Sequence, residues 1–297
     1  MLFSLLVSVL MVGFKLNSAK EIVQTIERRQ ELKVNLSMVR RLLEIEDAKA
    51  WIEDVAHDTK RREDRIAELE SASGQVYDLL EDALIAKGDA MFAVFEASSA
   101  AATQLEHSEL IMYSETMLDA ATGLLYGRAA AMVRTTPQEI VAICLDSVDS
   151  HFNRSTVDPT VFIRAEVVEH VNAHHTIIYN RCKAPGISDR TFLNSIVAKN
   201  VEEDPITYMI VALPIAQHEK ITRKDEKGVV RGENCRAFKL TEVATGITKM
   251  EYACSLNLGG SIPQAITNKV IVPGQMHGAH CFKLARSAPS FWPSTSF

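Results

Sequence analysis

The chain has 297 residues, of which 47% are hydrophobic and 24% charged, and its formal net charge is −6. This composition is typical of a globular protein of one or two domains. Nucleic acids bind clusters of Lys and Arg, so a net negative chain without a basic patch argues against DNA or RNA as a partner. The negative net charge also argues against binding to anionic lipid by electrostatic attraction alone.

The first apolar segment, residues 1–16, carries no charge from Met1 to Phe14. About 20 apolar residues are needed to span a bilayer, and a secretory signal would begin with basic residues. A helix end packed on the protein, a disordered start, and a signal or membrane anchor over residues 1–14 all remain open.

Residues 17–105 are predicted to form an α-helical hairpin or coiled coil. No Gly or Pro occurs from Lys15 to Ser71, and apolar residues recur there at helical spacing. A turn at residues 71–74 precedes a second helix, in whose interior Gly88 is modestly destabilising. The apolar positions of this second helix are Val76, Leu80, Leu84, Met91 and Phe95. The apolar stripe could instead bind a protein partner or a second copy of the chain.

Beyond residue 105 the apolar period changes from that of a helix to that of a strand. A strand over 123–134 leads to a helix ending at Leu145, with Thr136 as N-cap and Pro137 at its first position. Asn172 suits a tight turn between two paired strands. The later strands are predicted over 162–171, 173–182, 188–193, 206–215, 229–240 and 247–256.

The stretch from Val229 to Asn268 resembles the closing segment of START domains, the lipid-binding modules of lipid-transfer proteins. Two strands flank a turn at Gly246, and a Gly259-Gly260 break precedes a helix that begins near Pro263. The matching positions are Val230, Arg231, Glu233, Thr248, Lys249, Tyr252, Ser255, Leu256, Leu258, Gly260, Pro263 and Asn268. Residues 135–141 resemble the start of the family's first inner helix, and residues 188–193 resemble its R-D-F-V strand with Thr191 replacing Asp.

The resemblance implies an α+β helix-grip fold of the Bet v1-like superfamily, in which a curved antiparallel sheet wraps around a C-terminal helix. It covers about residues 108–272, and we assign residues 106–283 to this domain. The N-terminal helices resemble extensions that precede START-like domains in oomycete and algal proteins. Residues 257–261 lack the family's Asp and Trp, Pro273-Gly274 shortens the terminal helix, and residues 284–297 are expected to be disordered.

The helix-grip fold implies a lipid cavity between the sheet and the terminal helix. Because a one-residue slip exchanges the two faces of a strand, choosing the inward face is a prediction, and these side chains could instead fill a solid core. Arg231 is either a cavity cation or, as the cost of burying charge favours, a surface residue. The predicted cavity residues are Phe192, Asn194, Ile196, Tyr208, Ile210, Ala212, Arg231, Phe238, Leu240, Tyr252, Cys254, Ile262 and Ile266.

No catalytic motif, metal site or cofactor is predicted. On a helix the spacing of His170, His174 and His175 could hold zinc, but on strands and turns these side chains lie too far apart. The chain has no G-x-S-x-G or phosphate-binding loop. Its five cysteines (Cys144, Cys182, Cys235, Cys254 and Cys281) are odd in number and mostly lie in apolar runs, which favours a reducing, cytoplasmic compartment.

The predicted function is therefore non-catalytic lipid binding, with lipid transfer and transient membrane contact as further roles. The main alternative is an interaction or scaffold protein that acts through residues 17–105. An enzyme is a third reading, since helix-grip folds also include cyclases and hydrolases and a fold alone does not decide function.

Overall fold

The computed structural model describes residues 59–71, 73–97, 102–105, 111–120, 122–145, 162–183, 188–222 and 227–260, together with Ile262 and Asn268. The predictions for residues 1–58, for most of the terminal helix and for the tail 284–297 lie outside these residues. The chain divides into two compact units, Met1–Glu63 with Pro289–Phe297, and Asp64–Ala288. The second unit carries the sheet.

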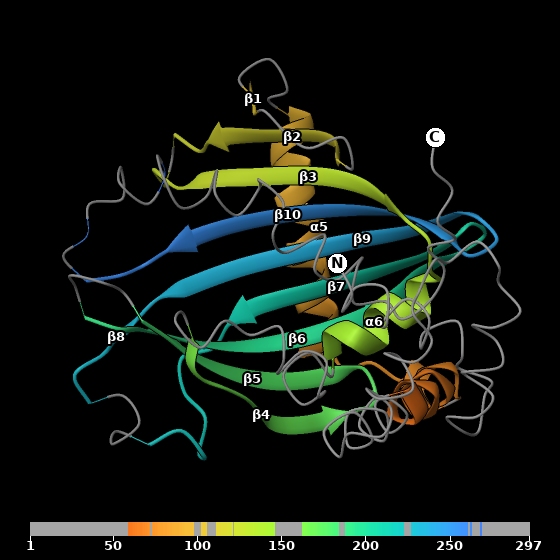
Figure 1. Ribbon diagram of the computed structural model, residues 1–297, viewed down its shortest axis with the longest axis horizontal. Coiled ribbons are helices and arrows are strands. Elements are labelled where there is room, and N and C mark those ends of the chain that lie inside the picture. Colours follow the sequence, from red (N-terminus) through yellow and green to blue (C-terminus); the bar gives the residue numbers. More distant parts are fainter. Residues whose placement is uncertain are drawn as a thin grey trace, which may run out of the picture. The chain divides into compact units, whose positions relative to one another are not determined.

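The second unit is built on one antiparallel sheet in the order β1-β2-β3-β10-β9-β7-β6-β5-β4, with the short β8 added parallel to β6 (Figure 1). The pairing of β3 with β10 places an early strand of this unit beside its last strand. The strands are β1 (Thr103–Gln104), β2 (Ile111–Leu118), β3 (Leu125–Val133), β4 (Phe162–Asn172), β5 (His175–Cys182), β6 (Arg190–Glu203), β7 (Ile206–Pro214), β8 (Val230–Arg231), β9 (Glu233–Ala244) and β10 (Ile247–Asn257).

The predicted strands are found from β3 onward, except that β6 continues to Glu203 and the strand predicted over 229–240 is divided into β8 and β9. Strands β1 and β2 were not foreseen. In β2 the residues from Ser114 to Met117 are all buried, so the strand lacks the alternation on which the prediction relied. The turn between β4 and β5 falls at Ala173-His174, and the side chain of Asn172 accepts a hydrogen bond from the His174 backbone N–H at 3.0 Å. The side chain of Asn172 therefore stabilises this turn.

Helix α5 (Leu79–Ala97) crosses one face of the sheet, which we call the outer face (Figure 1). Its buried side chains pack on residues of β6, β7, β9 and β10. A Cβ on Gly88 would lie 2.3 Å from Cγ2 of Val211, so glycine allows the helix to approach the sheet closely. Two predicted members of the apolar stripe, Val76 and Leu80, are 70% and 62% exposed instead.

The predicted boundary at residue 105 separates α5 from the sheet against which it packs. Residues 1–58 lie outside the described part of the chain, so the hairpin or coiled coil over 17–105 stays a prediction.

Helix α6 (Pro137–Leu145) packs on the opposite face, which we call the inner face (Figure 1). The Glu139 backbone N–H donates to Oγ1 of Thr136 at 3.3 Å, and the Thr136 backbone N–H donates to Oε2 of Glu139 at 3.1 Å. This reciprocal pair is a capping box. It confirms the predicted N-cap.

The corner after β10 depends on glycine. Gly259 and Gly260 have φ values of 65° and 67°, and a Cβ on Gly259 would lie 2.5 Å from the carbonyl oxygen of Arg231. Further on, Asn268 accepts from the Leu125 backbone N–H at 3.2 Å and donates to the Gly123 carbonyl at 2.9 Å. These two bonds fix residue 268 beside the turn that precedes β3.

Candidate functional site

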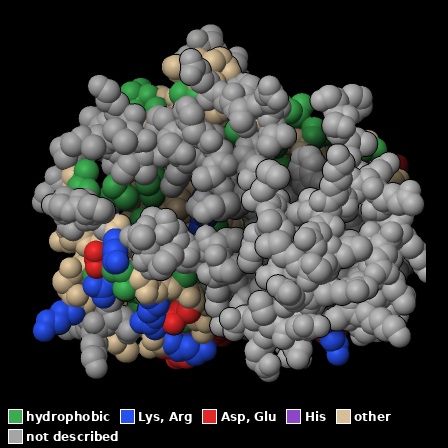
Figure 2. Space-filling view, in the orientation of Figure 1, with side chains coloured by type: hydrophobic (Ala, Val, Ile, Leu, Met, Phe, Trp, Pro, Cys, Tyr) green, Lys and Arg blue, Asp and Glu red, His purple; other side chains and the backbone are tan. Residues whose placement is uncertain are grey.

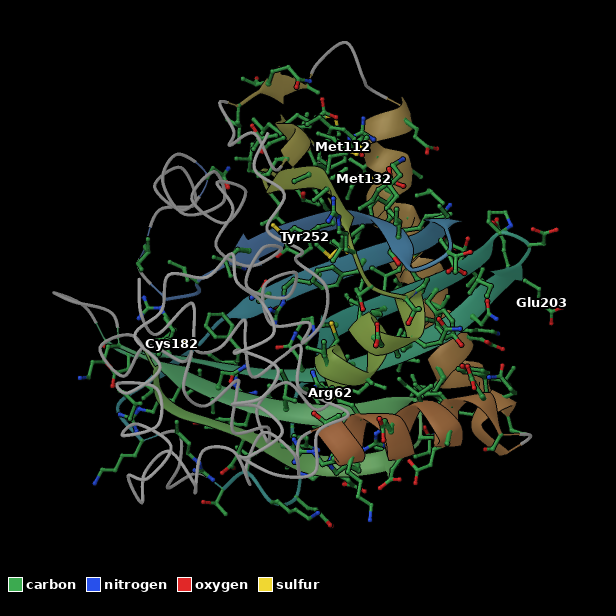
Figure 3. The ribbon with its side chains drawn as sticks, turned by 45° about the vertical axis from the view of Figure 1, so that its right-hand side comes forward. Arg62, Met112, Met132, Cys182, Glu203 and Tyr252 are labelled. Atoms are coloured by element: carbon green, nitrogen blue, oxygen red, sulfur yellow. The ribbon has the colours of Figure 1, made fainter. Side chains whose placement is uncertain are left out.

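The structure brings most of the predicted cavity residues together on the inner face. Tyr252, near the middle of the sheet, is one of them (Figure 3). Phe192 packs at the margin of the same cluster, and Asn194 is buried on the same strand face. That these side chains line a hollow stays a prediction. The other members of the α6-side cluster are Ile196, Tyr208, Ile210, Ala212, Phe238, Leu240 and Cys254.

Arg231 differs from the other predicted residues. It pairs with Thr191, and it interacts electrostatically with Tyr179, which packs with Leu193 in a separate cluster. Thr191 alternates with Phe192, so Arg231 faces the outer side. Its burial lowers the pKa of the guanidinium. Ile262 is half-buried, and Ile266 lies outside the described residues.

Charged groups gather at the end of the sheet that carries β8. Figure 2, seen from the α6 side, shows Lys, Arg, Asp and Glu side chains at the lower left, over β4, β5 and β8. Some form ion pairs at the surface: Arg181 bonds Asp189 at 3.0 Å, and Arg164 pairs with Glu166. Such exposed pairs contribute little to stability, typically about 0–1 kcal/mol each.

Two further arginines face inward near the same end, and the sequence analysis singled out neither of them. Arg190 precedes Phe192 by two residues on β6 and is only 4% exposed; its Nη1 donates to the Ser188 carbonyl. Arg236 lies on β9 opposite Ala212 and Cys254, and it is half-buried. Arg190 stands at the R of the R-D-F-V pattern, but neither arginine was predicted to face inward, because only the strand register decides which face a residue occupies.

Arg236 lies among cysteines of different elements: Cys144 of α6, Cys182 at the end of β5 and Cys254 of β10 (Figure 3 labels Cys182). Burial raises the pKa of these thiols to about 12, about 11 and about 12, although the nearby Arg236 charge opposes the rise. The thiols therefore stay protonated at neutral pH and pack as small apolar groups.

A second polar cluster, which the sequence analysis missed, lies between α5 and the turn from β4 to β5. We call Glu81, Asn172, His174, His175 and Ser195 the Glu81 cluster. Glu81 accepts from Nε2 of His174 at 3.0 Å, from Nδ1 of His175 at 2.9 Å and from Nδ2 of Asn172 at 2.8 Å. The partners are more than 90 residues apart in sequence, so no local pattern could reveal them.

The hydrogen bonds of the Glu81 cluster limit where its protons can lie. Nδ1 of His174 lies 3.0 Å from the Gly74 carbonyl, and Nε2 lies 3.0 Å from the Glu81 carboxylate. Both partners only accept hydrogen bonds, so the ring satisfies both of them only with a proton on each nitrogen. Burial alone would raise the pKa of Glu81. The hydrogen bonds from the Asp78 backbone, His174, Asn172 and His175 outweigh burial and lower this pKa to about 2.

Ser195, His175 and Glu81 have the spacing of a hydrolase triad, since Nε2 of His175 lies 2.7 Å from Oγ of Ser195. Ser195 is only 4% exposed, however, and Glu81, on α5, is 2% exposed. A substrate would reach the hydroxyl only if α5 left the sheet. The Glu81 cluster therefore acts as a clamp that fixes α5 to the β4–β5 turn.

No cluster of His, Cys, Asp and Glu in the described part of the chain is arranged to hold a metal ion. No described helix combines the length and the apolar composition needed to cross a bilayer.

No protein-family model and no curated protein matches the chain. Solved structures do. Human StAR-related lipid transfer protein 5 is 14% identical with a TM-score of 0.54, and the match covers 71% of this chain and 98% of that one. Human STARD10 is 14% identical with a TM-score of 0.53, covering 72% and 80%. A STAR-related lipid transfer protein from Xanthomonas axonopodis is 14% identical with a TM-score of 0.51, covering 64% and 99%. The chain thus has the helix-grip fold of START domains.

Proposed function

We propose that this protein binds one lipid molecule, without catalysis, between the inner face of the sheet and the elements that cover it. The observation that carries the proposal is the concentration of apolar side chains on the inner face of a START-like fold. Several solved proteins of this fold are named as lipid transfer proteins. Burial of a lipid chain stabilises a complex by roughly 25 cal/mol per Å² of apolar surface.

The direct test uses the purified full chain. Native mass spectrometry is recorded before and after incubation with vesicles, and the bound lipid is extracted and identified. The proposal predicts a one-to-one lipid complex. Protein that carries no lipid on purification and takes up none from vesicles of sterol, phospholipid or fatty acid would contradict it.

We further infer that the protein works as a carrier in a reducing, cytoplasmic compartment. The described cysteines Cys144, Cys182, Cys235 and Cys254 are free thiols, which supports this inference. Transfer is tested by following a fluorescent lipid from donor to acceptor vesicles with catalytic amounts of protein. Binding without any transfer would make the protein a lipid sensor or store instead.

An interaction protein acting through residues 17–105 is the second candidate, and one observation favours it. Val76, Leu79 and Leu80, at the start of α5, are 70%, 91% and 62% exposed. Exposed apolar side chains in a group can bind a partner. Light scattering of the full chain tests self-association: a Leu79→Gln/Leu80→Gln variant should convert an oligomer to a monomer if this reading holds, and a parent that is already monomeric excludes self-association.

A further inference from the structure

The inner face is mostly apolar, and Arg190 and Arg236 lie on it toward the end near β8. Arg190 is almost completely buried, and Arg236 is half-buried. The Nε of each guanidinium is buried and has no hydrogen-bond acceptor among the described residues, and neither arginine pairs with a described carboxylate. The other inward side chains named above are apolar residues, tyrosines, an amide and neutral thiols.

An unpaired buried cation is costly, because it loses its hydration without gaining a counter-charge. Elsewhere in the same domain arginines have acidic partners, as Arg128 has in Glu115 and Arg181 in Asp189. Arg190 and Arg236 thus lack the acidic partner that Arg128 and Arg181 have. A ligand that brings negative charge would supply it.

Arg190 and Arg236 lie in different rows of the sheet, because Arg236 aligns through Ala212 with Ile196, six residues along β6 from Arg190. Cys182 pairs with Arg190 across β5 and β6, and its thiol lies within electrostatic range of Arg236. The side chain of Arg236 therefore extends toward the end of the sheet where Arg190 lies. Nearby, Asn194 donates to the Asn234 carbonyl at 2.7 Å, while Oδ1 of Asn234 has no partner among the described residues.

We propose that Arg190 and Arg236 bind the oxyanion of a lipid head group, a carboxylate or a phosphate, while the acyl chain lies along the apolar inner face. This inference rests on the proposed function and narrows its ligand class from lipids in general to anionic lipids. A guanidinium donates two parallel N–H bonds to such an oxyanion, and the apolar residues beyond, such as Phe238 and Leu240, suit the chain.

The test compares lipids that differ only in head-group charge. Neutral phosphatidylcholine vesicles are doped with oleate and oleyl alcohol in equal amounts, or with phosphatidic acid and diacylglycerol. The full chain is incubated with them and re-isolated, and its bound lipid is quantified by mass spectrometry. The first pair reports on a carboxylate and the second on a phosphate. Because both lipids compete in one sample, their ratio does not depend on how much protein is folded.

We expect the parent to prefer the anionic member of at least one pair by tenfold or more. Arg236→Gln should reduce that preference by about 10- to 100-fold, as expected for loss of hydrogen bonds to a charged group. Arg190→Gln should act in the same direction. The control is Arg181→Gln, which removes the same charge from a surface ion pair and should keep the preference.

The outcomes separate the two proposals. Uptake of both members of each pair without preference, unchanged in Arg236→Gln, would overturn the anion site and leave lipid binding intact. An equal loss of preference in Arg236→Gln and Arg181→Gln would also overturn it, because the effect would then follow net charge alone. Absence of any bound lipid in the parent would overturn both.

Discussion

Buried ionisable side chains on the two faces of the sheet differ in the partners they have. On the outer face, Glu81 and His174 are both nearly fully buried, and each has the other as a hydrogen-bond partner. On the inner face, Arg190 is as deeply buried, yet the described residues supply no carboxylate to it. The Glu81 cluster is satisfied without a ligand, whereas Arg190 and Arg236 retain unused donors.

Under the proposed function, the outer face has a structural role and the inner face binds the ligand. A satisfied buried network fixes one arrangement of its elements, and here it fixes α5 to the β4–β5 turn. Unsatisfied buried donors lower stability, so their presence calls for an explanation outside the fold itself. Substitutions on the outer face should therefore change stability, and substitutions on the inner face should change lipid uptake.

The largest effect is expected for Glu81→Gln. The change removes the buried carboxylate that accepts from His174, His175 and Asn172. Loss of one partner of a buried ionic pair should cost about 3–5 kcal/mol of unfolding free energy. At roughly 2–4 °C per kcal/mol for a domain of this size, the melting temperature should fall by about 6–20 °C. Asp82→Asn, on the exposed side of the same helix turn, should cost about 1 kcal/mol or less. Equal melting of the two variants would contradict the clamp.

Because of the Glu81 carboxylate, we expect the folded protein to lose stability at acid pH. The pKa of Glu81 is lowered from its ordinary value of 4.5 to about 2 in the folded protein. The carboxylate's contribution is therefore complete above about pH 4.5 and is lost as the pH falls toward 2. The stability difference between the parent and Glu81→Gln, measured by urea unfolding, should shrink across this window. A difference that is constant from pH 6 to pH 3 would contradict the prediction.

A smaller effect is expected at Gly88, where α5 approaches the sheet. Alanine is the better helix former by about 1 kcal/mol, but its Cβ would overlap the Val211 side chain, and overpacking typically costs about 1–3 kcal/mol. Gly88→Ala should therefore destabilise the domain by about 1–2 kcal/mol in chemical denaturation. Asp89→Ala, at an exposed neighbour, serves as control and should stay within about 0.5 kcal/mol. A stabilised Gly88→Ala would mean that α5 does not pack this closely.

The smallest change in stability, with the largest change in uptake, is expected for Ala212→Phe. Ala212 lies on the inner face between Ile196 and Arg236. If the inner side holds a lipid, the ring should occupy its space, reduce uptake from vesicles more than tenfold and leave the unfolding free energy within about 1 kcal/mol.

A solid core gives the reverse outcome for Ala212→Phe: overpacking costs about 1–3 kcal/mol, and lipid uptake is unrelated to it. Ala244→Phe, at the exposed end of β9, is the matched control and should alter neither quantity.

The sequence predicted the elements whose signals are local. The capping pattern at Thr136 and the turn at Gly246 depend on neighbouring residues, and both are found where expected. Most residues predicted to face inward do lie on the inner face, although β7 is buried on both faces and its apolar run has no alternation that could decide the choice. These features and the family resemblance were sufficient for the fold.

The rest depends on contacts between distant residues. Glu81 meets His174 only because α5 lies across the sheet, and Arg236 approaches Cys182 only through the strand order. Arg231 lies in a motif that resembles the family's, yet its pairing with Thr191 turns it to the outer side. Periodicity gives a residue's face within a strand, but it gives neither the neighbouring strand nor the helix above it.

Photoaffinity labelling tests the division between the two faces most directly. The full chain is loaded with a lipid whose acyl chain carries a diazirine, irradiated, and mapped to single residues by mass spectrometry. The account predicts adducts on inward side chains such as Phe192, Phe238 and Tyr252, and on α6, with none on α5. Adducts confined to α5 and the outward residues, or lipid that is bound without any inner-face adduct, would contradict it.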